Sequence, residues 1–535
     1  MTPTSSRRDR VAHSRSVIAA SACSIAAGLA MSNAAYAQNI GQIWKNDCAS
    51  CHGERGAGGK TSAGADVPSL LDDAWKTDGS DRALFNAIQK GMPGVEGHAF
   101  SPAKTDAQIW SMVVNLREIR ARDARKRNGS PTAKDGVYTS KLGKFSVEEA
   151  IPGGLDVPWA VDFVPMQTPK GLKDLAGAML VTERAGTFRV ATKADPKAAT
   201  WTLSEPVAGM PKVASIGQGG LMDVAVHPDF ASNGWIYLGL SDPVKVVEGA
   251  KRSGAAMTIV VRGKLERDGT AWKWTNQETI YQAAQDKYTS GGLHFGCKIV
   301  FDPPTPSKAG APVKDRYVFW SIGERGQGKH AQDLTRPSGK VHRLHDDGRI
   351  PADNPFVDEE SKAKGYDGAI WSYGHRNPQG LHFDLDGNLW DTEHGPRGGD
   401  EVNLVQKGKN YGWPMVSFGI EYSGSPRATP WPEDAGKEIV MPVFVWLPSI
   451  GASGLDVVRP GPDGEAFPMW KNDLIAGGLS GANVDRIRIR DGKLVEREEL
   501  LQGMGRVRDV ATGPDGSVYI VLNDPDKVLR MVPVK

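Results

Sequence analysis

The sequence predicts a large all-β domain, a six-bladed β-propeller, preceded by a small all-α domain. The chain of 535 residues is longer than one hydrophobic core usually supports, so at least two domains are expected. Its 63 glycines and 35 prolines suit a turn-rich β protein better than a helical one. From about residue 150 onward, helical periodicity nearly vanishes, and short apolar runs alternate with Gly, Pro and Asp-Gly turns.

A repeated phrase supports the propeller directly. It consists of a short strand, a Pro-Asp or Asp-Gly turn, and a second strand rich in aromatic residues. A four-stranded sheet cannot bury both of its faces alone, and radial repetition packs the faces together and protects the edges. A pair of β-sandwiches is the alternative, but it does not explain the repetition. The copies lie at 158–190, 221–240, 296–326, 380–393, 455–467 and 507–523.

The first 37 residues predict a cleavable signal peptide. Four arginines precede an apolar, small-residue stretch at 16–31, and Ala35-Tyr36-Ala37 fits a cleavage site. An uncleaved anchor is the alternative. Removing these residues takes away four arginines and one aspartate and turns the formal net charge of +2 into about −1. We therefore expect a periplasmic protein with no integral membrane span after cleavage and no electrostatic basis for nucleic-acid binding.

The stretch "NDCASCHGERG" at 47–57 holds Cys48, Cys51 and His52 in the C-x-x-C-H pattern of covalent haem attachment. The two thioethers fix the edge of the porphyrin, and the adjacent histidine reaches the iron. A zinc site is the alternative, but it needs a second Cys or His pair at suitable spacing, and none follows. Cys297 remains, and we expect it to pack as a small hydrophobic residue.

Around this motif the chain resembles a class I cytochrome c. Helices are expected at 39–47 and 105–120, and residues 81–94 are expected to form a helix followed by a loop; the helix at 105–120 has Thr105 as its N-cap and an apolar stripe. Where this family usually has its methionine ligand, the sequence has Gly97. The sixth ligand of the haem iron is therefore open between Met92, which precedes a proline and is preferred, and His98.

These observations give an all-β six-bladed β-propeller with an N-terminal all-α cytochrome c domain. The predicted boundaries are a signal peptide at 1–37, a cytochrome c domain at 38–127, a linker at 128–149 and the propeller at 150–535. The basic run within 117–136 is read as a solvated helix end and linker, with a docking strip for an acidic partner as the alternative.

The loops between the predicted strands carry distinctive motifs. They include "YGHRNPQGLHF" at 373–383, "EHGPRGGDEVNL" at 393–404 and "KNYGWPMVSFG" at 409–419. Together with motifs at 217–230, 291–303 and 505–516, they resemble the soluble sugar dehydrogenases that depend on pyrroloquinoline quinone (PQQ), the glucose/sorbosone and aldose dehydrogenase family.

The resemblance implies two ligands in the propeller, PQQ and Ca²⁺. PQQ is a flat o-quinone with three carboxylates, so cationic side chains suit it. The backbone carbonyls of Gly395 and Pro396 match the family's calcium ligands. Asp400 and Glu401 are open between a calcium-binding role and bonding to a neighbouring loop. The residues that match cofactor contacts are Arg376, Asn377, Gln379, Arg506 and Arg508.

The resemblance also assigns the catalytic roles. His294 matches the general base, which must be neutral near pH 7 to take a proton from the anomeric hydroxyl. Glu324 stands where an aspartate orients that base, and Gln218 matches a residue near the sugar. Arg376 additionally stabilises negative charge on the quinone oxygen. His227 is expected to be structural, and Ser480 stands near the position of a cofactor-contacting lysine in the glucose enzyme.

The sequence therefore predicts a periplasmic quinohaemoprotein dehydrogenase that oxidises an aldose sugar, or a related polyol or aldehyde. Hydride passes to PQQ, electrons pass to the fused haem c, and a downstream periplasmic cytochrome or the quinone pool accepts them. A calcium-dependent propeller lactonase and a non-enzymatic, haem-bearing binding propeller are the alternatives. The substrate and the oligomeric state are left open.

Overall fold

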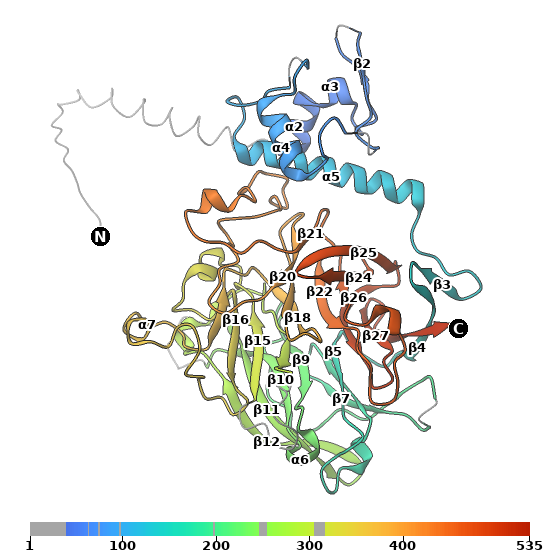
Figure 1. The fold of residues 1–535 in the computed structure, drawn as a ribbon. Coiled ribbons are helices and arrows are strands. Elements are labelled where there is room, and N and C mark those ends of the chain that lie inside the picture. Colours follow the sequence, from blue (N-terminus) through green and yellow to red (C-terminus); the bar gives the residue numbers. More distant parts are fainter. Residues whose placement is uncertain are drawn as a thin grey trace, which may run out of the picture.

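The computed structural model describes residues 39–534, apart from 63, 73–74, 96–97, 196–197, 246–253 and 304–315. The predicted signal peptide lies outside the described residues. The large domain is a six-bladed β-propeller, which confirms the predicted fold (Figure 1). Each copy of the repeated phrase contains the first strand of one blade or its first two strands, and the blades are antiparallel sheets of four or five strands.

The strand bounds follow the order of the blades around the ring. The first blade has β5 (Pro158–Phe163), β6 (Met179–Glu183), β7 (Phe188–Thr192) and β8 (Thr202–Leu203). The second has β9 (Leu221–Val226), β10 (Ile236–Pro243), β11 (Ala255–Asp268), β12 (Ala271–Tyr281) and β13 (Thr289–Ser290). The third has β14 (Ile299–Phe301), β15 (Tyr317–Ile322), β16 (Lys340–His345) and β17 (Ile370–Tyr373). The fourth has β18 (Pro378–Phe383), β19 (Leu389–Glu393), β20 (Asp400–Leu404) and β21 (Phe444–Trp446). The fifth has β22 (Ala452–Val457), β23 (Leu474–Gly478), β24 (Asn483–Arg490) and β25 (Lys493–Gln502). Short helices in the loops are α6 (Phe230–Asn233), α7 (Glu359–Ala363), η1 (Lys173–Leu175), η2 (Gln285–Lys287), η3 (Gly328–Gln332), η4 (Pro432–Ala435) and η5 (Pro468–Trp470).

The sixth blade joins the two ends of the propeller chain. Its strands run β26 (Arg506–Thr512), β27 (Val518–Asn523), β28 (Lys527–Val534), β4 (Gly143–Ile151) and β3 (Val137–Ser140). Because β4 pairs antiparallel with β28, the blade ring is closed by backbone hydrogen bonds. The segment 128–149, expected to be a linker, therefore contributes strands to the propeller. Phe145 is fully buried there and stacks on Tyr138.

The small domain is helical, as expected. Its last helix begins after Thr105, whose side chain forms a capping box with Gln108. This helix extends eight residues beyond the expected end at residue 120.

Among the described residues, no helix is long and apolar enough to cross a membrane. The elements of the small domain are α2 (Ile40–Asp47), α3 (Ala49–His52), β1 (Gly59–Lys60), β2 (Asp66–Val67), α4 (Asp81–Lys90) and α5 (Asp106–Asn128).

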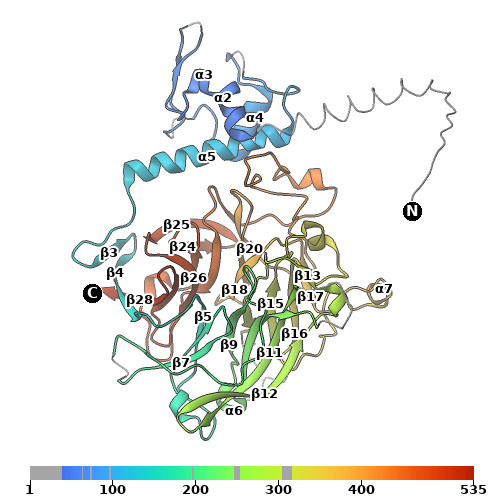
Figure 2. The same ribbon diagram turned by 180° about the vertical axis from the view of Figure 1, so that it is seen from behind.

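Helix α5 lies between the small domain and the propeller (Figure 2), and most of its residues from Gln108 to Ile119 are buried, on both faces of the helix. One face packs on the other helices of the small domain. On the other face, Trp110 donates a hydrogen bond from Nε1 to the carbonyl of Phe418 at 3.2 Å and packs edge-on against Trp431. The apolar core of the small domain thus continues into the propeller loops, so the two domains are docked by a shared core.

Ion pairs reinforce this contact. Glu118 accepts two hydrogen bonds from Arg397, at 2.9 and 2.6 Å, and its side chain is only 7% exposed. Arg125, near the end of α5, makes a second bidentate pair with Glu499 at 2.7 Å. Bidentate arginine–carboxylate pairs fix orientation as well as adding energy.

We expect Glu118→Gln to loosen the docking of the cytochrome domain. Losing a charge-assisted pair costs about 1.5–3 kcal/mol, which raises the frequency of local opening by about ten- to a hundred-fold. Hydrogen exchange of the loop at 417–431 measures this opening. Lys60→Gln is the control, because its pair with Asp66 is largely exposed, lies within the small domain and is worth at most about 1 kcal/mol. Equal exchange in both variants would contradict the proposed contribution of Glu118.

Candidate active site

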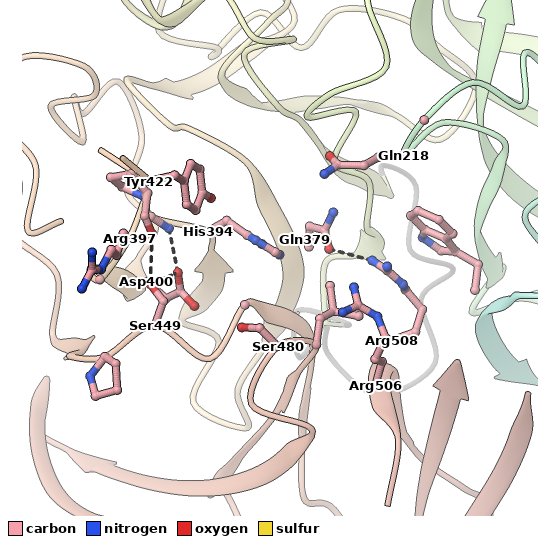
Figure 3. Close-up of a pocket in the computed structure, with 18 of the residues that line it drawn as sticks. Gln218, Gln379, His394, Arg397, Asp400, Tyr422, Ser449, Ser480, Arg506 and Arg508 are labelled. Carbon is pink, nitrogen blue, oxygen red and sulfur yellow. Dashed lines mark hydrogen bonds between the residues drawn. The ribbon is translucent and has the colours of Figure 1, made fainter. Parts of the chain in front are cut away.

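A cavity of about 480 Å³ lies where the propeller loops meet helix α5. Figure 3 shows residues that line it. Loops from several blades line it, and Glu118 of the cytochrome domain contributes to its wall. The arginines in the lining are Arg184, Arg397, Arg506 and Arg508. The two acidic residues in the lining, Glu118 and Asp400, are occupied by other protein groups. The cavity therefore presents an excess of positive charge.

Strand β26 supplies two of these arginines, and both line the same cavity (Figure 3). Arg508 donates from Nη1 to Gln379 Oε1 at 3.0 Å and lies over the Trp159 ring, 4.2 Å from its centroid. Burial, together with the neighbouring Arg506, lowers the pKa of Arg508 to about 9. A buried cation pressed against another cation is stabilised by an anion, so this corner suits an acidic ligand.

Arg376 and Asn377 lie directly behind the cavity wall, in the turn before β18. The Arg376 backbone N–H donates to Glu393 Oε2 at 2.6 Å, and its Nη1 donates to the carbonyl of His394 at 3.0 Å. The amide of Asn377 accepts from the Gly296 backbone at 3.2 Å. Arg376 Nε and Asn377 Nδ2 are buried without a hydrogen-bond partner among the described residues. Such donors are normally satisfied, so each of these two atoms has room for one further hydrogen bond, although neither residue belongs to the lining of the cavity itself.

His294 is held in one orientation by two neighbours. Its Nδ1 hydrogen-bonds to Glu324 Oε1, so the longer glutamate arm reaches the imidazole. Its backbone N–H donates to Gln218 Oε1 at 2.8 Å, and Gln218 itself lines the cavity. Burial, with Arg376 acting in the same direction, lowers the pKa of His294, although Glu324 opposes the shift. The imidazole is therefore neutral near pH 7, with Nε2 left to take a proton.

The loop that contains Gly395 and Pro396 also lines the cavity. The Pro396 carbonyl accepts a hydrogen bond from the Ser449 hydroxyl at 3.2 Å. Of the two alternatives for Asp400, the structure supports the bonding role. Its carboxylate accepts the backbone N–H groups of Gly395, Ile450 and Ala452 at 2.9, 3.0 and 2.8 Å. Asp400 thus fixes the loop that presents the two carbonyls.

A buried acidic cluster lies beneath this loop, and sequence reasoning missed most of it. His375, Asp391 and Glu393 place one ligand atom each within 4.8 Å of one another, an arrangement that could hold a cation. Burial lowers the pKa of His375, but the carboxylates of Glu393 and Asp391 outweigh it and raise the pKa to about 9. Burial and Glu393 raise the pKa of Glu401, whose carboxylate accepts a hydrogen bond from Asn403 at 3.2 Å.

His394 is a second residue that sequence reasoning missed. It lines the cavity, and its Nε2 is buried without a partner among the described residues. Burial and the surrounding cations, Arg376 and Arg508 first, lower its pKa well below the usual value. The sequence feature that could have identified His394 is its place in "EHGPR", directly before Gly395. Ser480 lines the same cavity.

The haem-attachment residues lie on and beside α3 of the small domain. Cys48 and Cys51 are half-buried, and Cys297 is buried in the propeller core as expected. The ring of His52 faces His98, with 3.4 Å between the two Nε2 atoms. Met92 lies in a turn in which it pairs with Val95.

Comparison with known proteins agrees with this geometry. A family model described as "Glucose / Sorbosone dehydrogenase" matches residues 155–530, which is more than half of the chain. The chain belongs to the glucose/sorbosone dehydrogenase family. A second model, "Cytochrome C oxidase, cbb3-type, subunit III", matches residues 35–114 and identifies the helical domain as a cytochrome c domain.

Individual relatives of this sugar dehydrogenase cover most of the propeller. "Aldose sugar dehydrogenase YliI" of Escherichia coli is 38% identical over 393 residues, or 72% of this chain and 92% of that protein. "Quinoprotein glucose dehydrogenase B" of Acinetobacter calcoaceticus is 26% identical, over 58% of this chain and 73% of that protein. The crystal structure of the soluble aldose sugar dehydrogenase from Escherichia coli in the apo-form superposes with a TM-score of 0.59 at 35% identity, covering 73% and 100% of the two chains.

Proposed function

We propose that this protein is a periplasmic, PQQ-dependent dehydrogenase of aldose sugars, or of related polyols or aldehydes, that passes electrons to its own haem c. The observation that carries the proposal is the set of unsatisfied donors beside His294. Arg376 Nε and Asn377 Nδ2 are buried donors without partners among the described residues, and His394 Nε2 is a buried ring nitrogen without one; His394 lines the cavity together with the arginines. A flat quinone with three carboxylates offers acceptors for these donors and countercharge for Arg506 and Arg508. The similarity to a quinoprotein supports the same cofactor.

The residues of the chain perform the proton chemistry. Glu324 accepts a hydrogen bond from His294 Nδ1–H and thereby leaves Nε2 as the base that takes the proton of the anomeric hydroxyl. Arg376, Asn377, Gln379, Arg506 and Arg508 would hold PQQ, which would supply the acceptor for the hydride from the same carbon, so that the sugar loses one proton and one hydride in total. Arg376 provides positive charge behind the site, and Gln218 fixes the His294 backbone. The docked α5 helix keeps the haem domain beside the cavity.

Calcium fits the loop at 395–396 as a further ligand. The backbone carbonyls of Gly395 and Pro396 are hard oxygen donors of the kind that Ca²⁺ prefers, and Asp400 holds their loop in place. The chemistry that the ion supplies is polarisation of the quinone carbonyl. We place the carboxylates of Glu393 and Glu401 behind this loop as a second set of oxygen donors.

The test of this function is substrate-dependent haem reduction. Purified, haem-loaded protein is reconstituted with PQQ and Ca²⁺, and the haem absorbance is followed after adding each of a panel of aldoses and polyols. We expect reduction by at least one aldose, and none when PQQ or Ca²⁺ is left out. Hydrolysis of lactones without any requirement for PQQ would overturn the proposal.

We expect Arg508→Gln to weaken PQQ binding by about ten- to a hundred-fold, because it removes a charge-assisted contact worth about 1.5–3 kcal/mol. Titration of apo-protein with PQQ, read as recovered activity, measures the change. Arg490→Gln is the control, since Arg490 pairs with Asp473 and does not line the cavity. Equal PQQ affinity in wild type and Arg508→Gln would contradict the placement of the quinone carboxylates.

A further inference from the structure

Two histidines of the cytochrome domain point their ring nitrogens at each other. The Nε2 atoms of His52 and His98 lie 3.4 Å apart, and the rings are inclined at 64° with centroids 5.6 Å apart. His52 follows the two cysteines of the haem-attachment motif, so its Nε2 is the atom expected to bind the iron on one side. His98 therefore presents a second imidazole nitrogen at the place where the other side of the iron has to be filled.

A direct hydrogen bond between the two rings does not explain this arrangement well. A distance of 3.4 Å exceeds the usual range of such bonds, which ends near 3.2 Å. The Nδ1 atoms of both rings are buried and have no hydrogen-bond partner among the described residues. No described hydrogen bond at Nδ1 therefore explains why the Nε2 atoms of the two rings face each other. Two metal–imidazole bonds of about 2 Å each need about 4 Å, so a shift of roughly 0.6 Å accommodates an iron.

The structure thus favours the residue that the sequence reasoning had placed second. Met92, the preferred sixth ligand, lies in a turn in which its backbone bridges to Val95, whereas His98 is the residue whose ring nitrogen faces His52. Class I cytochromes c usually have their methionine ligand at the position where this sequence has Gly97. His98 is the next residue.

We propose that His52 and His98 are the two axial ligands of the haem iron, which makes this a bis-histidine cytochrome c domain. Replacing a methionine ligand by histidine lowers the reduction potential. With both axial positions held by protein nitrogen, the iron has no open position for oxygen or carbon monoxide. The domain is therefore restricted to electron transfer. This inference requires covalent haem in the domain, and it does not depend on the proposed sugar oxidation.

The test uses the full-length, haem-loaded chain without PQQ or sugar, so its failure is separate from failure of the proposed function. Ferric wild-type protein should lack the weak far-red absorption band of a methionine–iron bond. Met92→Leu should leave the spectrum and the midpoint potential unchanged. His98→Met should produce the band and raise the potential, and His98→Ala should allow carbon monoxide to bind the ferrous haem.

A far-red band in the wild type that disappears in Met92→Leu would overturn the proposal. It would equally be overturned if His98→Ala kept the wild-type spectrum and still excluded carbon monoxide. Met92→Leu also serves as the folding control, because it changes the same loop without touching either histidine.

Discussion

Replacing His294 by glutamine is expected to lower kcat for sugar-dependent haem reduction by about 10²–10⁴-fold, the usual contribution of a general base. Glutamine keeps a polar side chain beside Glu324 and Gln218 but cannot take a proton. The affinity for PQQ should change little, because the hydrogen bonds described for His294 go to Glu324 and Gln218 and not to the arginines that line the cavity. Reconstituted variant and wild type are compared at saturating sugar.

His227→Gln is the control for this experiment. His227 is buried like His294, but it hydrogen-bonds to Asp346 at 3.1 Å, whereas His294 is joined through its backbone N–H to Gln218, a residue of the cavity lining. It should keep its turnover per folded molecule. Wild-type turnover in His294→Gln would remove His294 from the mechanism, whereas parallel losses in both variants would indicate a structural role.

The pH profile gives an independent readout of the same base. Burial lowers the pKa of His294, and the base must be neutral to act. The activity should therefore be flat around pH 7 and fall only when the pH drops below the ordinary histidine value of about 6.5. Glu324 opposes the shift, so Glu324→Gln should move this acid limb to lower pH while also reducing kcat. An acid limb that stays in place in Glu324→Gln would contradict the positioning role of Glu324.

The sequence predicted the blades because each repeated phrase holds contacts that are local in the chain. The first two strands of a blade face each other across a short turn, as at 380–393, where β18 pairs with β19. The closing strand β4 was missed because its partner, β28, lies nearly 400 residues away and no local pattern reports such a pairing. The outer strands vary from the two residues of β8 to the eleven of β12, which hides their periodicity.

The site shows the same division between local and distant information. Motif resemblance assigned roles to His294, Arg376 and Arg508 although they come from two different loops between blades and from strand β26 of the sixth blade. It could not reveal Glu118, because that residue reaches the cavity from another domain. It also ranked Met92 above His98, since the Met-Pro pair was the only local cue. In α5, the predicted stripe covered one face, whereas Trp110 on the other face docks the propeller.

We expect Lys298→Met to cause the largest loss of stability among single changes near the propeller axis. The Lys298 ammonium lies 3.1 Å from Asp223 and 2.9 Å from Asp509, and all three side chains are nearly inaccessible. Asp223 belongs to β9 and Asp509 to β26, while Lys298 immediately precedes β14. The triad thus connects three different blades beneath the cavity. Removing one partner of a buried ion pair costs about 3–5 kcal/mol, because it leaves charge buried without compensation.

Denaturant unfolding followed by tryptophan fluorescence measures this loss. Lys362→Met is the control, because Lys362 pairs with Glu359 on the surface of α7 and its replacement should cost less than about 1 kcal/mol.

The pH dependence of the free energy of unfolding follows from the two carboxylates. Burial raises the pKa of Asp509 to about 6 even with Lys298 present, and a folded-state pKa above the unfolded value means that stability falls as the pH rises. Without the ammonium this effect grows, so the deficit of Lys298→Met should shrink on acidification.

A triple variant separates lost charge compensation from lost packing. Lys298→Met combined with Asp223→Asn and Asp509→Asn removes the uncompensated charges and keeps side chains of similar volume. Because the cost of a broken buried pair comes mostly from the charges left behind, the triple variant should recover a large part of the stability lost by the single change. If the triple variant is as unstable as Lys298→Met at neutral pH, Lys298 stabilises the protein by packing. The ion pairs between the three blades would then make no net contribution to stability.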